Sequence, residues 1–389
     1  MISQALLFTM SFRQSLKRWH NMGLFDREIL LLNKLVEKGH YGAIWILSYD
    51  YDDHAFLAAC QADGRISGHV HVVTPPRALA GLCKNPIGAL VYSVLAPFSV
   101  MKVLPRDAFV IRNNQVSGVW TALLLQRLSK RPFIFRCGYS LSKRLRFNGS
   151  PIKAFIAAQL ERLALRSCTL CVVSAEDIKD YYSSLVPQAR IVVNPTFVDA
   201  DLFRSRDGLN ARDPLLYVGR LEPQKNVESL IEACAELGAP LHVYGDGTLR
   251  SKLEQQARNL GAKVEFRGVV TNSELSEVHQ QHSIYVLPSL TDPMPKTLIE
   301  AMASGLICVA TPTAGAVELI EDGHTGLLTA GFSASDIANG LRRAITELPT
   351  QLGAAARTKI VDRNSLDGFV NQEVGAFADQ TMPASQAAG

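Results

Sequence analysis

Short runs of apolar, often β-branched residues alternate with segments of helical periodicity along almost the whole chain of 389 residues. This alternation is typical of parallel sheets, whose strands are buried on both faces and are joined by crossover helices. The segment 26–38 places Ile29, Leu32 and Leu35 on one helical face and ends at Gly39, which suits a helix C-cap. The strands predicted in the first half are 6–10, 43–47, 109–111, 133–135 and 170–173, and the segment 191–203 is predicted to end the same sheet. The pattern therefore predicts an α/β fold.

A second α/β series begins after the polar stretch 204–213, which we interpret as an interdomain linker. Its predicted helices are 227–237 and 297–304, and its predicted strands are 215–218, 241–244, 264–266, 284–287 and 306–310. A chain of 389 residues exceeds the size at which one hydrophobic core stops growing, so two domains with a cleft between them are expected. We assign residues 1–200 to the first domain, 201–360 to the second, and 361–389 to a C-terminal helix and flexible tail.

The composition, with 47% hydrophobic and 20% charged residues, is that of an ordinary soluble protein and argues against disorder. Residues 1–10 lack a basic segment before their apolar run, which predicts a buried strand and not a signal peptide. The apolar segment 86–104 is interrupted by Pro86, Pro97 and Lys102. We expect two apolar helices there that are buried or touch a membrane face, and not a membrane span.

Seven cysteines, an odd number, favour a reducing compartment and a cytoplasmic location. Cys168 and Cys171 have the spacing of a redox or zinc motif, but they run directly into an apolar strand and have no second pair. We interpret them as buried core thiols. Acidic residues at 50, 52 and 53 follow a strand and could hold a divalent metal, although a polar loop is the favoured interpretation, so no metal is predicted.

The charge differs sharply between the two halves. Residues 1–195 carry 24 Lys and Arg against 12 Asp and Glu, whereas residues 196–389 carry 16 against 24. A half with a net charge of +12 favours an anionic partner, such as a phosphorylated acceptor or an anionic membrane surface. The alternative is a solvated basic face without a specific ligand.

The first motif surrounds the end of the predicted strand 215–218. Gly219 allows a tight turn there and leaves Arg220 and Lys225 at the carboxyl end of the sheet, where open α/β folds bind ligands. Arg offers a planar fork of donors and Lys a compact charge, and together they could hold a diphosphate. The alternative is a surface loop with two ordinary basic residues.

The second motif places Asp292 in a proline-rich loop and Glu300 eight residues later on the helix that this loop opens. Pro295 fixes φ at the helix start, and the unpaired amides of the first turn form an anion site. One carboxylate could bind a sugar hydroxyl and the other ribose hydroxyls. The alternative is an acidic turn that complements the helix dipole and a Glu that faces solvent.

Glycines follow several predicted strand ends, where a missing side chain would let a nucleotide approach the backbone. They are Gly245, Gly247, Gly268 and Gly315. A single Gly-Asp-Gly segment is weak evidence, because such segments mark ordinary turns.

Five motifs follow one another in the second half of the chain: VGRLEPQKN, VYGDG, VEFRGVV, LPSLTDPMPKTLIEAMASG and GAVELIEDGHTGLL. In this order they resemble the donor half of the group 1 (GT4-like) family of GT-B retaining glycosyltransferases. The resemblance implies a GT-B fold of two Rossmann-like domains and a nucleotide-diphosphate sugar as donor substrate, without a further cofactor. It implies that Arg220 and Lys225 hold the diphosphate, that Glu300 binds ribose and that Asp292 contacts the sugar. The implied donor contacts also include Gly219, Gly245, Phe266, Gly268, Pro293, Met294, Pro295, Lys296 and Thr297.

Two positions depart from the family. Asp292 stands where the family usually has Glu, and Arg136 to Tyr139 stand where it often has a histidine. On the acceptor side, the resemblance suggests Gly23, as the glycine of the first loop, together with Asn114 and Gly138. Ordinary turn chemistry is the alternative for the segment around Asn114.

The resemblance thus implies a retaining glycosyltransferase that moves a sugar to a glycan or lipid-linked acceptor in bacterial cell-surface polysaccharide synthesis, and the basic first half favours an anionic acceptor. We expect a cytoplasmic protein, with peripheral contact to the inner face of the cell membrane as a further expectation, and no nucleic-acid partner. The alternatives are a sugar-nucleotide epimerase of the same fold and a degenerate scaffold that binds nucleotide sugar without catalysis.

Overall fold

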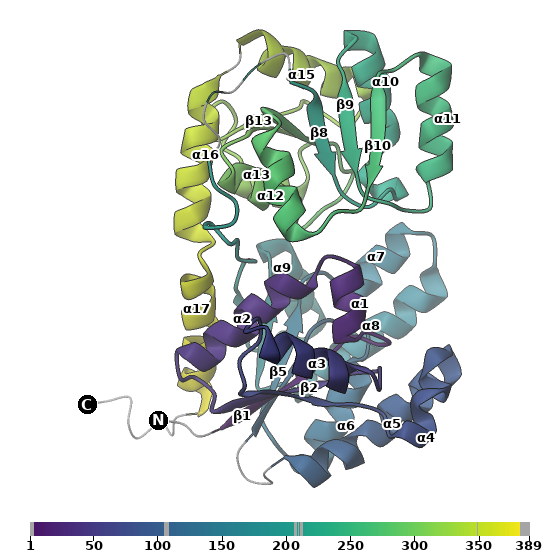
Figure 1. Cartoon of the computed structure of the whole chain (residues 1–389), viewed down its shortest axis with the longest axis vertical. Coiled ribbons are helices and arrows are strands. Elements are labelled where there is room, and N and C mark those ends of the chain that lie inside the picture. Colours follow the sequence, from purple (N-terminus) through teal and green to yellow (C-terminus); the bar gives the residue numbers. More distant parts are fainter. Residues whose placement is uncertain are drawn as a thin grey trace, which may run out of the picture. The chain divides into compact units, whose positions relative to one another are not determined.

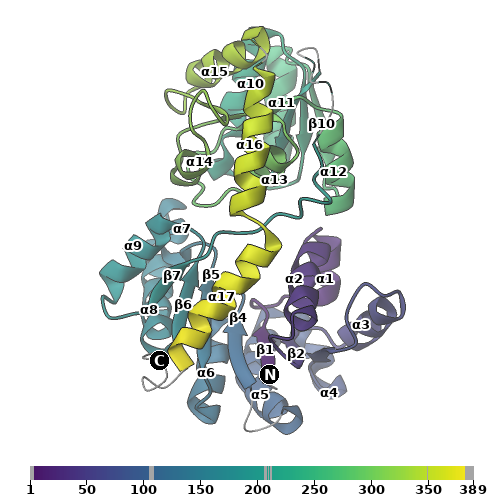
Figure 2. The same cartoon turned by 90° about the vertical axis from the view of Figure 1, so that its left-hand side faces the viewer.

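A computed structural model describes residues 4–104, 109–205, 208, 210, 213–347 and 349–381. The chain forms two compact units (Figures 1 and 2). The second unit is Thr196–Gly368, and the first contains the chain up to Pro195 and again from Phe369 onward. Each unit has one parallel sheet with helices around it, so the predicted pair of Rossmann-like α/β domains is confirmed.

The first unit is built on a seven-stranded parallel sheet in the order β3-β2-β1-β4-β5-β6-β7. Its strands are β1 (Ala5–Thr9), β2 (Ala43–Leu47), β3 (Val70–Val73), β4 (Phe109–Asn113), β5 (Phe133–Cys137), β6 (Leu170–Val173) and β7 (Ile191–Val193). Its helical segments are α1 (Leu16–Asn21), α2 (Phe25–Glu37), α3 (Asp53–Ala62), α4 (Arg77–Ala80), η1 (Leu82–Lys84), α5 (Pro86–Val103), α6 (Val119–Ser129), α7 (Leu141–Phe147), α8 (Pro151–Ser167) and α9 (Glu176–Leu185).

The second unit is built on a six-stranded parallel sheet in the order β10-β9-β8-β11-β12-β13. Its strands are β8 (Leu215–Val218), β9 (Leu241–Tyr244), β10 (Val264–Gly268), β11 (Ile284–Leu287), β12 (Ile307–Ala310) and β13 (Leu327–Leu328). Its helical segments are η2 (Pro223–Lys225), α10 (Val227–Leu237), α11 (Arg250–Leu260), α12 (Asn272–Gln280), α13 (Lys296–Ala303), α14 (Ala314–Leu319), α15 (Ala334–Glu347) and α16 (Thr350–Arg363), after which α17 (Leu366–Thr381) follows.

The central strands form because their sequences are apolar on both faces. All residues of β4, β8, β11 and β12 are buried, as expected for strands covered by helices on both sides. In each sheet the strand order reverses beside the first strand, between β1 and β4 and between β8 and β11. At such a point the connections on either side diverge and leave a crevice at the carboxyl ends of the strands. The fold therefore indicates where to look for a site in each unit.

The apolar segment 86–104 forms the single helix α5, so the predicted break at Pro97 is wrong. Proline lacks the amide that would donate to the carbonyl of residue 93, four positions earlier. The hydroxyl of Thr121 in α6 donates to the Ser93 carbonyl at 3.0 Å in its place, and Trp120 Nε1 donates to the Ser93 hydroxyl at 2.8 Å. A tertiary contact thus satisfies the group that the proline frees. Among the described residues, α5 is the one helix long and apolar enough to cross a membrane.

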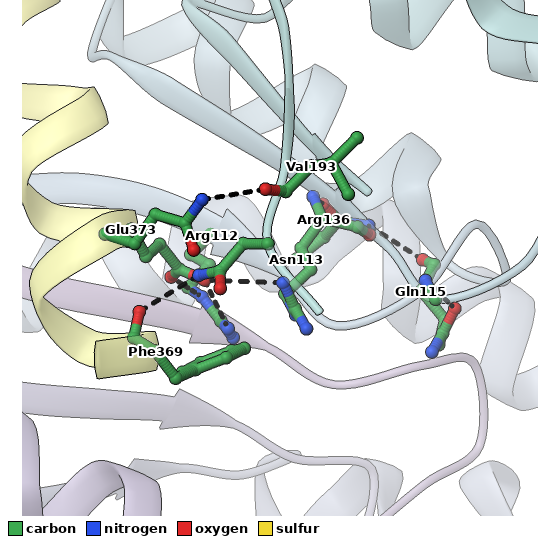
Figure 3. Close-up of polar contacts among 10 residues, drawn as sticks. Arg112, Asn113, Gln115, Arg136, Val193, Phe369 and Glu373 are labelled. Carbon is green, nitrogen blue, oxygen red and sulfur yellow. Dashed lines mark hydrogen bonds and ion pairs between the residues drawn. The ribbon is translucent and has the colours of Figure 1, made fainter. Parts of the chain in front are cut away.

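The C-terminal helix α17 is anchored in the first unit by a buried ionic cluster (Figure 3). Glu373 Oε1 accepts a hydrogen bond from Arg112 Nε at 2.6 Å, and Oε2 accepts one from Arg112 Nη2 at 3.2 Å. Arg136 Nη1 lies 3.6 Å from Oε2 as well. Burial would raise the pKa of Glu373, but the two guanidinium groups hold it below its usual value. The Phe369 ring covers the Arg136 guanidinium. The predicted C-terminal helix is therefore present, whereas residues 382–389 of the predicted tail lie outside the described residues.

The seven cysteines are all free thiols. Cys171 is buried in β6, and burial raises the pKa of its thiol well above the usual value, which suits the predicted role as a core residue. Asp53 of the acidic segment 50–53 is also buried, and its carboxylate accepts hydrogen bonds from the amides of Leu16 and Lys17 at the start of α1. The Asp53 carboxylate thus has hydrogen-bond partners within the protein.

Candidate functional site

The loop after β8 and the loop after β9 touch at two glycines. The Gly219 amide donates to the Tyr244 carbonyl at 2.9 Å. Gly245 has φ +134°, and a Cβ atom there would overlap the Gly219 carbonyl oxygen. Only glycine fits at position 245, because both the backbone angle and the space forbid a side chain. These two predicted glycines thus bring the ends of neighbouring strands into direct backbone contact.

A hydrogen bond from Tyr217 fixes the loop that carries Arg220. The Tyr217 side chain is fully buried, and its hydroxyl donates to the Arg220 carbonyl at 3.0 Å. A Cβ atom on Gly219 would lie 2.7 Å from that hydroxyl, so the glycine leaves room for this hydrogen bond. Burial raises the pKa of Tyr217, and nearby Asp292 raises it further. The tyrosine therefore stays a neutral donor, while the Arg220 side chain is exposed at the sheet edge.

Lys225 lies at the end of η2, where the chain turns into α10. The turn uses Asn226 in the left-handed region, with φ +54°, and its side-chain amide donates to the Phe332 carbonyl at 2.9 Å. The Leu290 amide donates to the Gln224 carbonyl at 2.9 Å and ties η2 to the loop that follows β11. As a result, Lys225 forms an ion pair with Asp292, 67 residues away in the chain.

The loop from 288 to 295 is held on two further sides. The Thr311 hydroxyl donates to the Ser289 carbonyl at 2.6 Å. On the other side, the Gly315 amide in the first turn of α14 donates to the Asp292 carbonyl at 3.1 Å. A Cβ atom on Gly315 would lie 2.6 Å from the Asp292 and Pro293 carbonyl oxygens and from Pro295 Cδ. The loop thus has little freedom to move toward α14.

Helix α13 begins directly after this loop, with Pro295 as its N-cap residue. In the described part of the chain, no side chain caps the helix start. The first-turn amides of such a helix carry a partial positive charge and suit an anion. The Thr297 hydroxyl and the hydroxyl of buried Tyr285 share a hydrogen bond of 2.7 Å, which fixes the first turn on β11. Glu300 follows one turn later and is only 8% exposed.

The remaining donor-side residues line the ends of β9 and β10. The Gly245 amide donates to the Gly268 carbonyl at 2.7 Å, and Gly268 has φ +76°. Phe266 is half-buried and packs against the core of the second unit. Met294 and Pro295 are buried, so the loop can offer backbone groups there more readily than side chains. All predicted donor residues therefore lie at the carboxyl edge of one sheet, along the strands β10, β9, β8 and β11.

In the first unit, the predicted residues Asn114 and Gly138 lie in neighbouring strand-end loops. The Asn114 amide donates to the Thr9 carbonyl at 3.2 Å, and the Gly138 amide donates to the Gln115 side chain at 3.1 Å. Gly23 lies elsewhere, in the turn between α1 and α2, with φ +67°. Gly118 is the glycine that approaches the loop after β1, since a Cβ atom there would lie 2.8 Å from the Phe12 amide nitrogen.

Some positions that shape the site carry no role in the sequence prediction. Tyr217 and Tyr285 are buried tyrosines within otherwise aliphatic strands, and each directs its hydroxyl to a predicted loop or helix. A tyrosine inside a core strand needs a hydrogen-bond partner for its hydroxyl. The presence of tyrosine in these apolar strands was therefore the sequence signal for such a contact. Thr311 gives the same kind of signal at the end of β12. Among the described residues, no group of three His, Cys, Asp or Glu is arranged to hold a metal ion.

The second half of the chain resembles a known protein family. Residues 203–359 match the family model described as "Glycosyl transferases group 1". A relative in Campylobacter jejuni is 30% identical over 189 residues, which cover 46% of this chain and 52% of the relative. Its name is GalNAc-alpha-(1->4)-GalNAc-alpha-(1->3)-diNAcBac-PP-undecaprenol alpha-1,4-N-acetyl-D-galactosaminyltransferase. The alpha-D-kanosaminyltransferase of Streptomyces kanamyceticus is 28% identical over 246 residues, 58% of this chain and 64% of the relative.

The match to these curated relatives thus spans between half and two thirds of their length. Among solved structures, Anabaena HepE in complex with UDP and glucose matches 97% of this chain and 100% of its own, with a TM-score of 0.72 and 17% identity. That likeness concerns the fold and extends over both units. Residues 203–359 are thus similar to the group 1 glycosyl transferases, and the two parallel-sheet units have the fold of the GT-B glycosyltransferases.

Proposed function

We propose that this protein is a retaining glycosyltransferase that takes its sugar from a nucleotide-diphosphate donor bound at the carboxyl edge of the second sheet. The observation that carries the proposal is the ion pair between Lys225 and Asp292 at the start of α13. A cation, a carboxylate and the first turn of a helix meet at one point, where the diphosphate and the sugar of such a donor need opposite kinds of partner. The family match over the same residues supports this interpretation.

Departure of the nucleotide diphosphate builds negative charge on the leaving phosphate and positive charge on the sugar ring. Lys225, exposed Arg220 and the first-turn amides of α13 would stabilise the leaving group, each donor contributing a few kcal/mol in a site that excludes water. A phosphate that binds Lys225 competes with Asp292 for the ammonium group. The Asp292 carboxylate then becomes available as an acceptor for a sugar hydroxyl. Glu300, one turn into α13, would accept hydrogen bonds from ribose.

In this proposal the acceptor hydroxyl attacks from the face that the diphosphate leaves, and the leaving phosphate takes the acceptor's proton. The sugar is the only group transferred, and the products are a nucleotide diphosphate and the extended acceptor. The donor is a substrate, and no separate cofactor is part of the proposal. Arg220 and Lys225 supply the positive charge that a metal ion would otherwise supply.

We further propose a glycan or lipid-linked anionic acceptor and a role in bacterial cell-surface polysaccharide synthesis at the inner face of the cell membrane. The net charge of +12 on residues 1–195 favours an anionic acceptor. The name of the Campylobacter relative describes transfer to a glycan linked to undecaprenol through diphosphate, which is an acceptor of this class.

The proposal is tested by incubating the full chain with a panel of nucleotide sugars and measuring released nucleotide diphosphate, with and without lipid-linked diphosphate sugars as acceptors. Acceptor-dependent release from one donor is the expected result. Conversion of a donor to a different nucleotide sugar without release would show an epimerase. Binding of a donor in calorimetry without turnover on any acceptor of the panel would show a scaffold that binds but does not transfer.

A further inference from the structure

The outer side of α5 carries large apolar side chains. The helix packs its smaller residues inward, including Gly88, Ala89, Ser93 and Ala96, all of which are buried. Ile87 is 78% exposed and Phe98 is 54% exposed. The outward positions follow a helical spacing and are Ile87, Leu90, Val91, Val94, Leu95 and Phe98. A helix on the surface of a soluble domain usually presents polar residues outward, whereas α5 presents large apolar residues.

The start of α8 carries a second group of exposed apolar side chains. Ile152 is 77% exposed, and Phe155 and Ile156 are also exposed. Helix α6 packs against both α5 and α8, which places the three helices on one face of the first unit (Figures 1 and 2). The six outward residues of α5 named above and these three of α8 are together called the apolar face. Soluble monomers rarely leave large apolar patches exposed unless something binds them.

The part of the sequence that contains the apolar face is basic. Between residues 64 and 160 the sequence holds fourteen Lys and Arg residues and a single acidic residue, Asp107. Lys84 and Lys102 are exposed near the two ends of α5, and Lys153 is exposed between Ile152 and Phe155. Of the basic residues on α7, Arg146 is exposed, whereas Lys143 pairs with Asp177 at 3.2 Å. A surface that is apolar at its centre and basic at its edges matches an anionic lipid layer.

We propose that the apolar face docks onto an anionic phospholipid bilayer, with α5 lying in the plane of the headgroups and its outward side chains among the upper acyl chains. The inference rests on the proposed function, because a lipid-linked acceptor would be reached at such a surface. The inner side of α5 stays packed on α6 through the hydrogen bonds to Ser93, so the helix does not leave the unit to span the membrane. A nucleic acid would match the charge but would leave nine apolar side chains in water.

The test is sedimentation of the full chain with vesicles of phosphatidylcholine alone and of equimolar phosphatidylcholine and phosphatidylglycerol. The protein should bind the anionic vesicles more strongly, and added salt should weaken that binding. Combining Lys84→Gln, Lys102→Gln and Lys153→Gln should lower the partition coefficient by about fivefold for each charge removed. Combining Ile87→Ser and Phe98→Ser should lower it by roughly tenfold or more, with a remainder of binding that is still sensitive to salt.

The matched control is the pair Leu260→Ser and Val269→Ser, which removes two exposed apolar side chains from the second unit. This variant should bind vesicles as the wild type does. A second measurement does not depend on how the double variants fold: an environment-sensitive dye at Ile87→Cys should shift its emission on anionic vesicles, and the same dye at Val269→Cys should not.

The proposal is overturned if the wild type does not sediment with anionic vesicles at low salt, or if Ile87→Ser with Phe98→Ser binds them as tightly as the control pair. It is equally overturned if a duplex oligonucleotide binds the protein and the emission of the dye at position 87 does not change when vesicles are added. Nucleotide release from a donor, measured without vesicles, reports on the transferase separately. Vesicle binding through α5 without any nucleotide release would leave the docking surface intact and remove the proposed enzymatic function.

Discussion

Gly315 allows the role of the loop 288–295 to be tested with a single methyl group. In Gly315→Ala the new Cβ atom would lie 2.6 Å from two loop carbonyl oxygens and from Pro295 Cδ, whereas ordinary contact begins near 3.4 Å. The loop must therefore withdraw by roughly 0.8 Å, because two of the three neighbours are backbone atoms. Overpacking of this size destabilises a core by about 1–3 kcal/mol. A displacement approaching 1 Å in a catalytic site can lower the rate by about 10²-fold.

The expected result for Gly315→Ala is a fall in kcat/KM on the order of 10²-fold, beyond what the fraction of unfolded protein explains. The assay is nucleotide release at saturating acceptor, with thermal unfolding followed in parallel. Gly353→Ala is a matched control, since its Cβ atom would overlap the Gly305 carbonyl oxygen in the same unit but away from the loop. It should lower Tm and spare kcat/KM.

Gly375→Ala is the second control, because a Cβ atom there has no neighbour within 4 Å and alanine favours the helix. This variant should be as active as the wild type and equally or more stable. If Gly315→Ala retains both the wild-type kcat/KM and the wild-type Tm, then the tightness of the loop against α14 has no bearing on the site and the reasoning fails.

The other predictions concern ligand binding, packing and pH. Glu300→Gln should weaken nucleotide and nucleotide sugar alike in calorimetry, whereas Asp292→Asn should spare the free nucleotide and weaken the sugar nucleotide; equal losses on both ligands for both variants would contradict this division. Thr121→Val leaves the Ser93 carbonyl beside Pro97 without its donor and should lower the free energy of unfolding by about 1–3 kcal/mol, measured by urea denaturation. Burial lowers the pKa of His279 to about 3 from the usual 6.5, so its stabilising effect is complete above pH 6.5 and is lost as pH falls from there toward 3. The free energy of unfolding should therefore drop in that window by on the order of 1 kcal/mol per pH unit, and His279→Gln should flatten the slope.

The sequence predicts both sheets well because their central strands are buried on both faces. Continuous apolar runs such as 215–218 and 284–287 differ clearly from the amphipathic helices beside them. The prediction missed β3 (Val70–Val73), where His71 interrupts a four-residue run, and β13, which has only two residues. Short edge strands of this kind depend on pairing with a neighbour and leave little trace in the local sequence.

The face of α5 could not be predicted from periodicity, because both sides of the helix are apolar. The core side combines the small residues Gly88, Ala89 and Ala96 with bulky Tyr92, while Ile87 and Phe98 are left outside. The helix also continues through Pro97, since Thr121 satisfies the freed carbonyl from another element. Both outcomes depend on tertiary contacts between residues far apart in the sequence.

For the candidate site, the sequence predicted motifs at strand ends, and in the structure they lie at one edge of the second sheet. The sequence did not show how they are joined. The pairing of Lys225 with Asp292 bridges 67 residues and depends on the Leu290 to Gln224 backbone hydrogen bond, which no spacing rule reveals. The glycines predicted to admit a ligand also serve the chain itself, since Gly245 makes room for the Gly219 backbone. The anchoring of α17 by Glu373 likewise needs two arginines from β4 and β5.

The central claim is that Lys225 stabilises the leaving diphosphate of a sugar donor, and Lys225→Ala tests it most directly. Released nucleotide diphosphate should be measured under single-turnover conditions with the active donor, alongside donor binding by calorimetry. Because charge on the leaving phosphate grows during the reaction, the loss should amount to about 2–4 kcal/mol of transition-state stabilisation, mostly in kcat. A folded Lys225→Ala protein that transfers sugar at the wild-type rate would contradict the account.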